Sequence, residues 1–88
     1  MRFRRIQWDV DAWEEYCSWQ AANKAVLKRI NLLIQDITRD AFDGIGKPEP
    51  LKEDLAGFWS RRIDEENRLI YAIEDTVVVI ISCKGHYE

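Results

Sequence analysis

The chain has 88 residues, enough for one hydrophobic core, so we expect a single domain spanning residues 1–88. The 47% hydrophobic content excludes a disordered chain, and no apolar run approaches the roughly 18 residues that a membrane-spanning helix needs. The net charge of −3 argues against a general nucleic-acid binder, although basic residues cluster locally. We therefore expect a cytoplasmic protein without membrane association.

The first part of the chain predicts one strand and two helices. Residues 3–8 mix β-branched and aromatic side chains with arginines, which favours a strand. Asp9 is a good N-cap for a helix over residues 9–22, where apolar residues recur at helical spacing. Asn23 can cap a second helix, whose apolar positions are Val26, Leu27, Ile30, Leu33, Ile34 and Ile37. The short connection implies an antiparallel helix pair in which each helix lays an apolar stripe on a sheet.

Residues 40–57 form a long segment that is neither helical nor strand-like. Glycine and proline recur along it, at Gly44, Gly46, Pro48, Pro50 and Gly57. Loops longer than about 12–15 residues in compact domains are usually functional or disordered. Interspersed apolar residues indicate order, so this loop is a candidate for part of a functional site.

The last part of the chain predicts an antiparallel meander of strands over residues 58–63, 68–73 and 76–83. The two-residue period of a strand gives one largely apolar face, on which Arg61 is the exception. We expect the stem of Arg61 to be packed and its guanidinium to be solvated. The predicted fold is thus α+β, with two N-terminal antiparallel helices on one face of a mostly antiparallel four-stranded sheet.

The usual metal and cofactor motifs are missing from the sequence. His86 is the single histidine, and Cys17 and Cys83 do not have the spacing of metal ligands. The Gly44-Ile45-Gly46-Lys47 run fits neither a P-loop nor a dinucleotide-binding motif. We therefore expect no metal and no cofactor.

The remaining polar residues include a carboxylate in the Gly/Pro loop, nearby lysines, arginines on strands and a near-terminal histidine. RNA cleavage without a metal needs such groups: a base for the ribose 2′-OH, cations for the phosphate and an acid for the leaving 5′-oxygen. These residue types are also common on solvated charged surfaces, so their presence alone leaves both interpretations open.

The order of these residues is more specific. The chain contains Gly44-x-Gly46-Lys47-Pro48-Glu49-Pro50-Leu51-Lys52, then Leu55-x-Gly57-Phe58-Trp59-Ser60-Arg61-Arg62-Ile63, then Glu65-Glu66-x-Arg68-Leu69-Ile70-Tyr71, and finally His86-Tyr87. Together these runs resemble the YoeB (Txe) branch of the RelE toxin superfamily over nearly the whole chain. The resemblance implies a microbial-RNase-like fold and a toxin of a type II toxin-antitoxin system. Such a toxin cleaves mRNA at the ribosomal A site, is silenced by a cognate YefM-type antitoxin and is often a homodimer.

The resemblance also implies a role for individual residues. Glu49 would be the general base and His86 the general acid, while Arg68 stabilises the phosphate and Tyr87 orients the substrate. Lys52 and Arg62 would be auxiliary phosphate contacts. Cleavage would leave a 2′,3′-cyclic phosphate and a 5′-hydroxyl.

The sequence departs from the family pattern at three positions. Asn67 stands where the family usually has histidine, Gly85 replaces an aromatic residue before the His-Tyr pair, and Glu88 follows the tyrosine. Two alternatives therefore accompany the main hypothesis. One is a non-enzymatic ParE-like toxin that binds DNA gyrase, and the other is a catalytically weakened relative that only binds the antitoxin or the ribosome.

Overall fold

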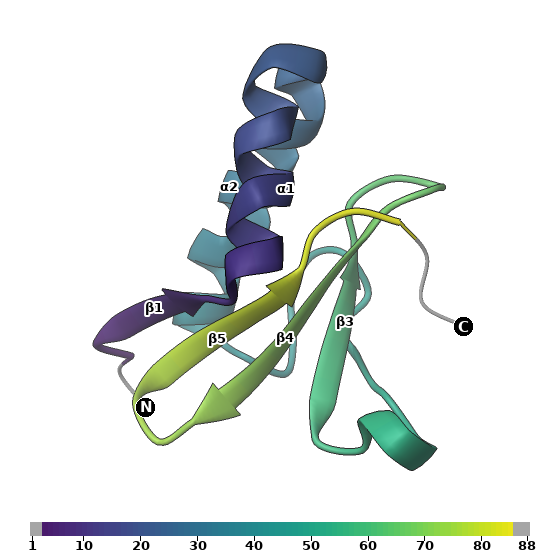
Figure 1. Cartoon of the computed structure of the whole chain (residues 1–88). Coiled ribbons are helices and arrows are strands. Elements are labelled where there is room, and N and C mark those ends of the chain that lie inside the picture. Colours follow the sequence, from purple (N-terminus) through teal and green to yellow (C-terminus); the bar gives the residue numbers. More distant parts are fainter. Residues whose placement is uncertain (1–2, 86–88) are drawn as a thin grey trace.

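In the computed structural model, which describes residues 3–85, two helices cover one face of a five-stranded sheet (Figure 1). The strand order is β1-β5-β4-β3-β2. In chain order the elements are β1 (Arg5–Trp8), α1 (Val10–Ala22), α2 (Lys24–Arg39), β2 (Glu49–Pro50), the 3-10 helix η1 (Glu53–Leu55), β3 (Phe58–Arg62), β4 (Arg68–Glu74) and β5 (Val77–Ser82).

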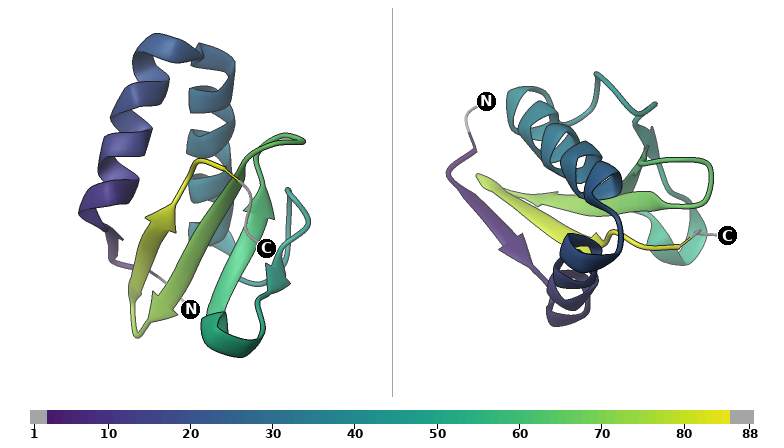
Figure 2. Two further views of the ribbon diagram at one scale, coloured as in Figure 1. Left: turned by 45° about the vertical axis from the view of Figure 1, so that its right-hand side comes forward. Right: turned by 90° about the horizontal axis from the view of Figure 1, so that it is seen from above.

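The two helices lie side by side and antiparallel, as predicted (Figure 2). The side chain of Asn23 accepts hydrogen bonds from the backbone N–H groups of Ala25 and Val26, which confirms its role as the cap of α2. Asp9 precedes α1 but makes no capping hydrogen bond with its side chain. The helices also contribute unequally to the core: α2 buries five of its six predicted positions and leaves Leu27 partly exposed, whereas the one fully buried residue of α1 is Ala12.

The sheet has one more strand than the sequence predicted. Strands β3, β4 and β5 form the expected antiparallel meander, and β1 pairs with β5 in parallel. The additional strand, β2, consists of Glu49 and Pro50 and pairs antiparallel with β3. A two-residue strand has no periodic pattern to detect, and its proline is tolerated because β2 lies at the edge of the sheet. The predicted loop is therefore partly a strand.

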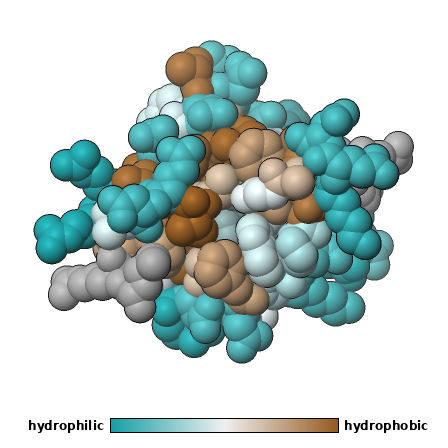
Figure 3. Space-filling view, turned by 90° about the horizontal axis from the view of Figure 1, so that it is seen from below, coloured by the Kyte–Doolittle hydropathy of each residue, from teal (hydrophilic) through white to brown (hydrophobic). Residues whose placement is uncertain are grey.

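The core lies between the helices and the sheet face that holds Leu69 and Tyr71 of β4 and Val78 and Ile80 of β5. The opposite face of the sheet has no helix over it (Figure 1) and holds Ser60 and Arg62 of β3 and Arg68 of β4. Seen from below, the molecule has apolar residues in the middle of its surface and hydrophilic residues around them (Figure 3). Among residues 3–85, no helix is long and apolar enough to cross a membrane.

Arg61 corrects one prediction, because its guanidinium is fully buried rather than solvated. All five of its N–H donors are used. The acceptors are the Tyr71 hydroxyl at 3.1 Å, Asp36 Oδ2 at 2.6 Å, and the carbonyl oxygens of Ile45 at 3.1 Å, Asp40 at 2.7 Å and Asp43 at 3.3 Å. The sequence could not show this, since the acceptors come from segments 10 to 25 residues away. The arginine fastens the segment after α2 to β3.

Two further groups complete this buried network. Hydrogen bonds from Arg39, the Ile45 backbone and Arg61 lower the pKa of Asp36 to about 2. Burial raises the pKa of Tyr71, whose hydroxyl donates to the Ala41 carbonyl oxygen at 2.8 Å. The carboxylate and the neutral phenol therefore match the donors and acceptors around them.

Candidate active site

Pairing of β2, β3 and β4 brings the predicted base and the predicted phosphate-binding arginine together. Glu49 is opposite Ser60 in the sheet register, and Arg62 is opposite Arg68. Because paired residues and residues two apart in a strand share a face, these four side chains lie on the face that the helices leave open.

Direct contacts connect three of these residues. Nη1 of Arg68 donates to Glu49 Oε1 at 3.4 Å and to Ser60 Oγ at 3.3 Å. The Ser60 side chain is fully buried, the Arg68 side chain is 22% exposed and the Glu49 side chain is 59% exposed. The buried Ser60 hydroxyl thus holds the Arg68 guanidinium against the sheet, while the Glu49 carboxylate remains accessible to a ligand.

The backbone around Glu49 is held on both sides by β3. Before it, the Gly46 carbonyl oxygen accepts a hydrogen bond from Arg62 N at 2.6 Å, and after it, Leu51 N donates to the Phe58 carbonyl oxygen at 2.9 Å. Gly46 has a φ of +80°, and a Cβ there would lie 2.7 Å from Leu33 Cδ2. The same Cβ would lie 3.1 Å from the Arg62 carbonyl oxygen of β3, so a glycine lets this loop pass close to both α2 and the sheet.

The two residues predicted to be auxiliary phosphate contacts, Arg62 and Lys52, have different positions. Arg62 is exposed at the end of β3, next to Arg68. Lys52 is exposed just after β2, where its carbonyl oxygen accepts a hydrogen bond from Leu55 N in the turn of η1. Arg62 therefore lies on the strand that pairs with the strand of Glu49, and Lys52 lies three residues after Glu49 in the chain.

His86 and Tyr87 lie outside the described residues, but the residue before them is bonded to the site. The Gly85 carbonyl oxygen accepts a hydrogen bond from Arg68 N at 3.1 Å, and Gly85 N donates to Asn67 Oδ1 at 2.8 Å. The chain therefore reaches position 86 from a point directly beside the backbone of Arg68.

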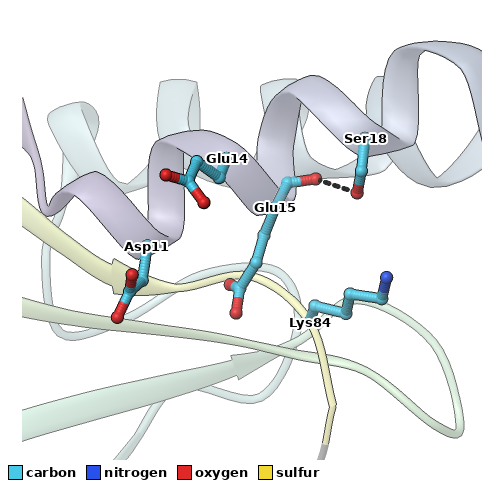
Figure 4. A pocket seen from close by; sticks show the side chains of 5 residues that line it. All are labelled: Asp11, Glu14, Glu15, Ser18 and Lys84. Carbon is cyan, nitrogen blue, oxygen red and sulfur yellow. Dashed lines mark hydrogen bonds between the residues drawn. The ribbon is translucent and has the colours of Figure 1, made fainter.

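Helix α1 holds the same segment from its other side. Glu15 Oε1 accepts from Cys83 N at 2.8 Å and from Ser82 Oγ at 3.2 Å, and Trp19 Nε1 donates to the Cys83 carbonyl oxygen at 3.0 Å. Figure 4 shows Glu15 extending from α1 toward this segment, in a shallow pocket that Lys84 also lines. The segment after β5 is thus fixed to both α1 and β4.

Ser60 and Asn67 are site residues that sequence reasoning missed or misjudged. Ser60 lies two residues before Arg62 and shares its strand face, which was the signal available for it. Asn67 is a buried residue whose side chain is fully hydrogen bonded, although its identity only marked it as a departure from a family pattern. Within residues 3–85, no cluster of three or more His, Cys, Asp or Glu side chains could hold a metal ion.

The similarity of the chain to known proteins extends along nearly its whole length. Residues 8–87 match the family model described as the YoeB-like toxin of bacterial type II toxin-antitoxin systems. The chain belongs to this YoeB-like toxin family. This confirms the resemblance seen in the motifs and favours a YoeB-type toxin over the ParE-like alternative.

Relatives and solved structures agree with this assignment. Toxin YoeB of Synechocystis sp. is 58% identical over 77 residues, which are 88% of this chain and 90% of that protein. The toxin in a YoeB-YefM complex from Staphylococcus aureus is 45% identical, with a TM-score of 0.89 over 99% of this chain and 100% of its counterpart. A YoeB dimer from the same organism is 44% identical, with a TM-score of 0.90 and the same coverage.

Proposed function

We propose that this YoeB-like toxin is a ribosome-dependent endoribonuclease that cleaves mRNA by attack of a ribose 2′-OH. The observation that supports this most strongly is the contact between Glu49 and Arg68 on the open face of the sheet, with the Gly85 backbone bonded beside it. A base, a cation and the segment leading to His86 thereby meet in one small area.

The reaction follows from the chemistry of these groups. Glu49 accepts the proton of the 2′-OH, the 2′-oxygen attacks the phosphorus, and the bond to the 5′-oxygen breaks. Arg68 stabilises the negative charge that develops on the phosphate oxygens, and His86 donates a proton to the leaving 5′-oxygen. The products are a 2′,3′-cyclic phosphate and a 5′-hydroxyl.

Three further residues have supporting roles in the proposal. Arg62 and Lys52 contact neighbouring phosphates of the message. Tyr87 orients the nucleotide. These cations give the site a local positive charge that the net charge of −3 does not reveal.

The partners follow from the relatives. The S. aureus proteins named above form a YoeB-YefM complex and a YoeB dimer. In our proposal a YefM-type antitoxin binds and silences this toxin, and the toxin forms a homodimer. The target is mRNA in the A site of cytoplasmic ribosomes. Large apolar side chains that are exposed in the isolated chain give such partners surface to bury: Ile6, Val10, Trp13, Leu32, Phe42 and Ile45.

The test is cleavage of mRNA by the purified chain on translating ribosomes, with the new ends mapped. Replacing a group that transfers a proton costs about 100-fold or more in rate, so we expect this loss for Glu49→Gln and for His86→Ala. Glu53→Gln is the matched control, because Glu53 is an exposed glutamate of the same segment. We expect the control to cleave like wild type.

Two results would overturn the proposal. One is the absence of cleavage by the wild-type chain on ribosomes that it binds, which would favour the catalytically weakened alternative. The other is equal cleavage by Glu49→Gln and Glu53→Gln. End chemistry is a separate check, since fragments with a 5′-phosphate would exclude attack by the 2′-OH.

A further inference from the structure

Asn67 is fixed in the turn between β3 and β4 and is 8% exposed. Its Nδ2 donates to Asp64 Oδ1 at 3.1 Å and to Oδ2 at 3.2 Å, and its backbone N donates to Asp64 Oδ1 at 2.7 Å. Its carbonyl oxygen accepts from Ile63 N at 3.0 Å. The amide group is therefore oriented by the turn itself and presents its Oδ1 oxygen in one direction.

That oxygen accepts the hydrogen bond from Gly85 N at 2.8 Å. Strand β5 ends at Ser82, so the segment after it has left the sheet ladder before Gly85 bonds to Asn67 and Arg68. This segment passes the turn between β3 and β4 in Figure 1. Both backbone groups of Gly85 are thus bound by two consecutive residues, of which the second is the arginine of the site.

The backbone conformation of Gly85 sets the direction in which the chain continues after this contact. Its φ of +87° is readily adopted by glycine, and the chain changes direction there. Consecutive Cα atoms are about 3.8 Å apart across a trans peptide, so residue 86 follows this fixed point at the shortest possible chain distance. Fixing the N–H of Gly85 therefore restricts the volume that the His86 imidazole can reach.

We infer that Asn67 is a positioning residue that holds the segment preceding His86 beside Arg68. This inference rests on the proposed function, and it gives a role to a residue that departs from the family pattern. The amide supplies a donor for Asp64 and an acceptor for Gly85 at the same time. The asparagine thereby joins the turn between β3 and β4 to the segment after β5.

Two substitutions of Asn67 distinguish its hydrogen bond to Gly85 from its hydrogen bonds to Asp64. Asn67→Ala removes both the acceptor and the donor. Asn67→Asp keeps an oxygen for Gly85 N and places a second carboxylate next to Asp64, so it weakens the turn but preserves the hold on Gly85. Asn31→Ala is the control, because Asn31 Oδ1 accepts one hydrogen bond, from the Tyr16 hydroxyl at 2.7 Å, in the helix pair.

We expect Asn67→Ala to lower the cleavage rate at saturating ribosomes at least 10-fold, with a KM within twofold of wild type. Asn67→Asp and Asn31→Ala should stay within threefold in rate. Hydrogen exchange of the Gly85 amide should be slow in wild type and Asn67→Asp and at least 10-fold faster in Asn67→Ala. Equal rates for Asn67→Ala and Asn67→Asp would overturn the inference, because the residue would then act only through the stability of the turn.

A measurement on the free protein distinguishes failure of this inference from failure of the proposed function. His86 is the single histidine of the chain, so its imidazole resonance in an NMR spectrum needs no further assignment. We expect this resonance to shift between wild type and Asn67→Ala and to be unchanged in Asn31→Ala. An identical resonance in wild type and Asn67→Ala would overturn the inference even if the wild-type chain cleaves mRNA, and a shift would support it even if no cleavage is found.

Discussion

Replacing Arg61 by lysine tests whether the buried guanidinium holds the fold together. Lysine keeps the positive charge but has three N–H donors, so at least two of the five acceptors around Arg61 lose their partner. A buried polar group without a partner costs about 1–3 kcal/mol. We therefore expect Arg61→Lys to lower the free energy of unfolding by about 3 kcal/mol.

That loss is large for a chain of this size. Total stability is roughly 0.05–0.15 kcal/mol per residue, and 1 kcal/mol shifts Tm by about 4–8 °C in a small domain. The Tm of Arg61→Lys should therefore fall by about 12–24 °C. Urea unfolding and thermal unfolding followed by circular dichroism measure both quantities.

Arg39→Lys is the matched control because Arg39 binds the same carboxylate. Its Nε donates to Asp36 Oδ1 at 2.9 Å, but its side chain is 61% exposed. An exposed ion pair contributes about 0–1 kcal/mol, so this variant should lose less than about 1 kcal/mol. Similar losses for the two variants, or a loss under about 1 kcal/mol for Arg61→Lys, would refute the reasoning.

Three further predictions follow from the described contacts. The pKa of Asp36 is about 2 in the folded chain and 3.8 without its partners, so the stabilisation from its carboxylate is complete above about pH 5 and is lost as the pH falls to about 2. Urea unfolding should therefore show that the stability of Asp36→Asn declines less steeply than that of wild type between these pH values. An equally steep decline for both proteins would contradict the prediction. Asn23→Ala removes two capping hydrogen bonds and should cost about 1 kcal/mol in urea unfolding; an unchanged midpoint would exclude a capping contribution. Iodoacetamide at neutral pH should modify the exposed Cys17 and leave Cys83 intact, because Cys83 is buried and burial raises the pKa of its thiol to about 12. Mass spectrometry measures the modification of each cysteine, and equal modification of the two would argue against the described packing.

Features of the fold that depend on residues close together in the sequence could be predicted from the sequence. The apolar spacing in α2 and the cap at Asn23 are local patterns, and both are confirmed. Strand phase also placed Arg61 on the core-facing side correctly. Its burial could not be predicted, because it depends on Asp36 and on three backbone carbonyls that only the folded chain brings near. Residue polarity alone favoured a solvated head.

The site was predicted by resemblance rather than by physical reasoning on the chain. Glu49 and Arg68 are 19 residues apart, and their contact depends on the two-residue strand β2, which sequence patterns do not reveal. The roles of Ser60 and Asn67 depend on sheet register and on the path of the last segment. A site assembled from four separate elements requires the tertiary structure before its members can be seen together.

The parallel pairing of β1 with β5 determines when the sheet can be completed during synthesis of the chain. The partner of β1 is β5, at residues 77–82, and each pair of partner residues is 72 positions apart in the chain, as in Arg5 and Val77. While a ribosome is still making the chain, β1 has no neighbour, and the core lacks Val78 and Ile80. The domain therefore completes its fold only after residues 77–82 have emerged from the ribosome.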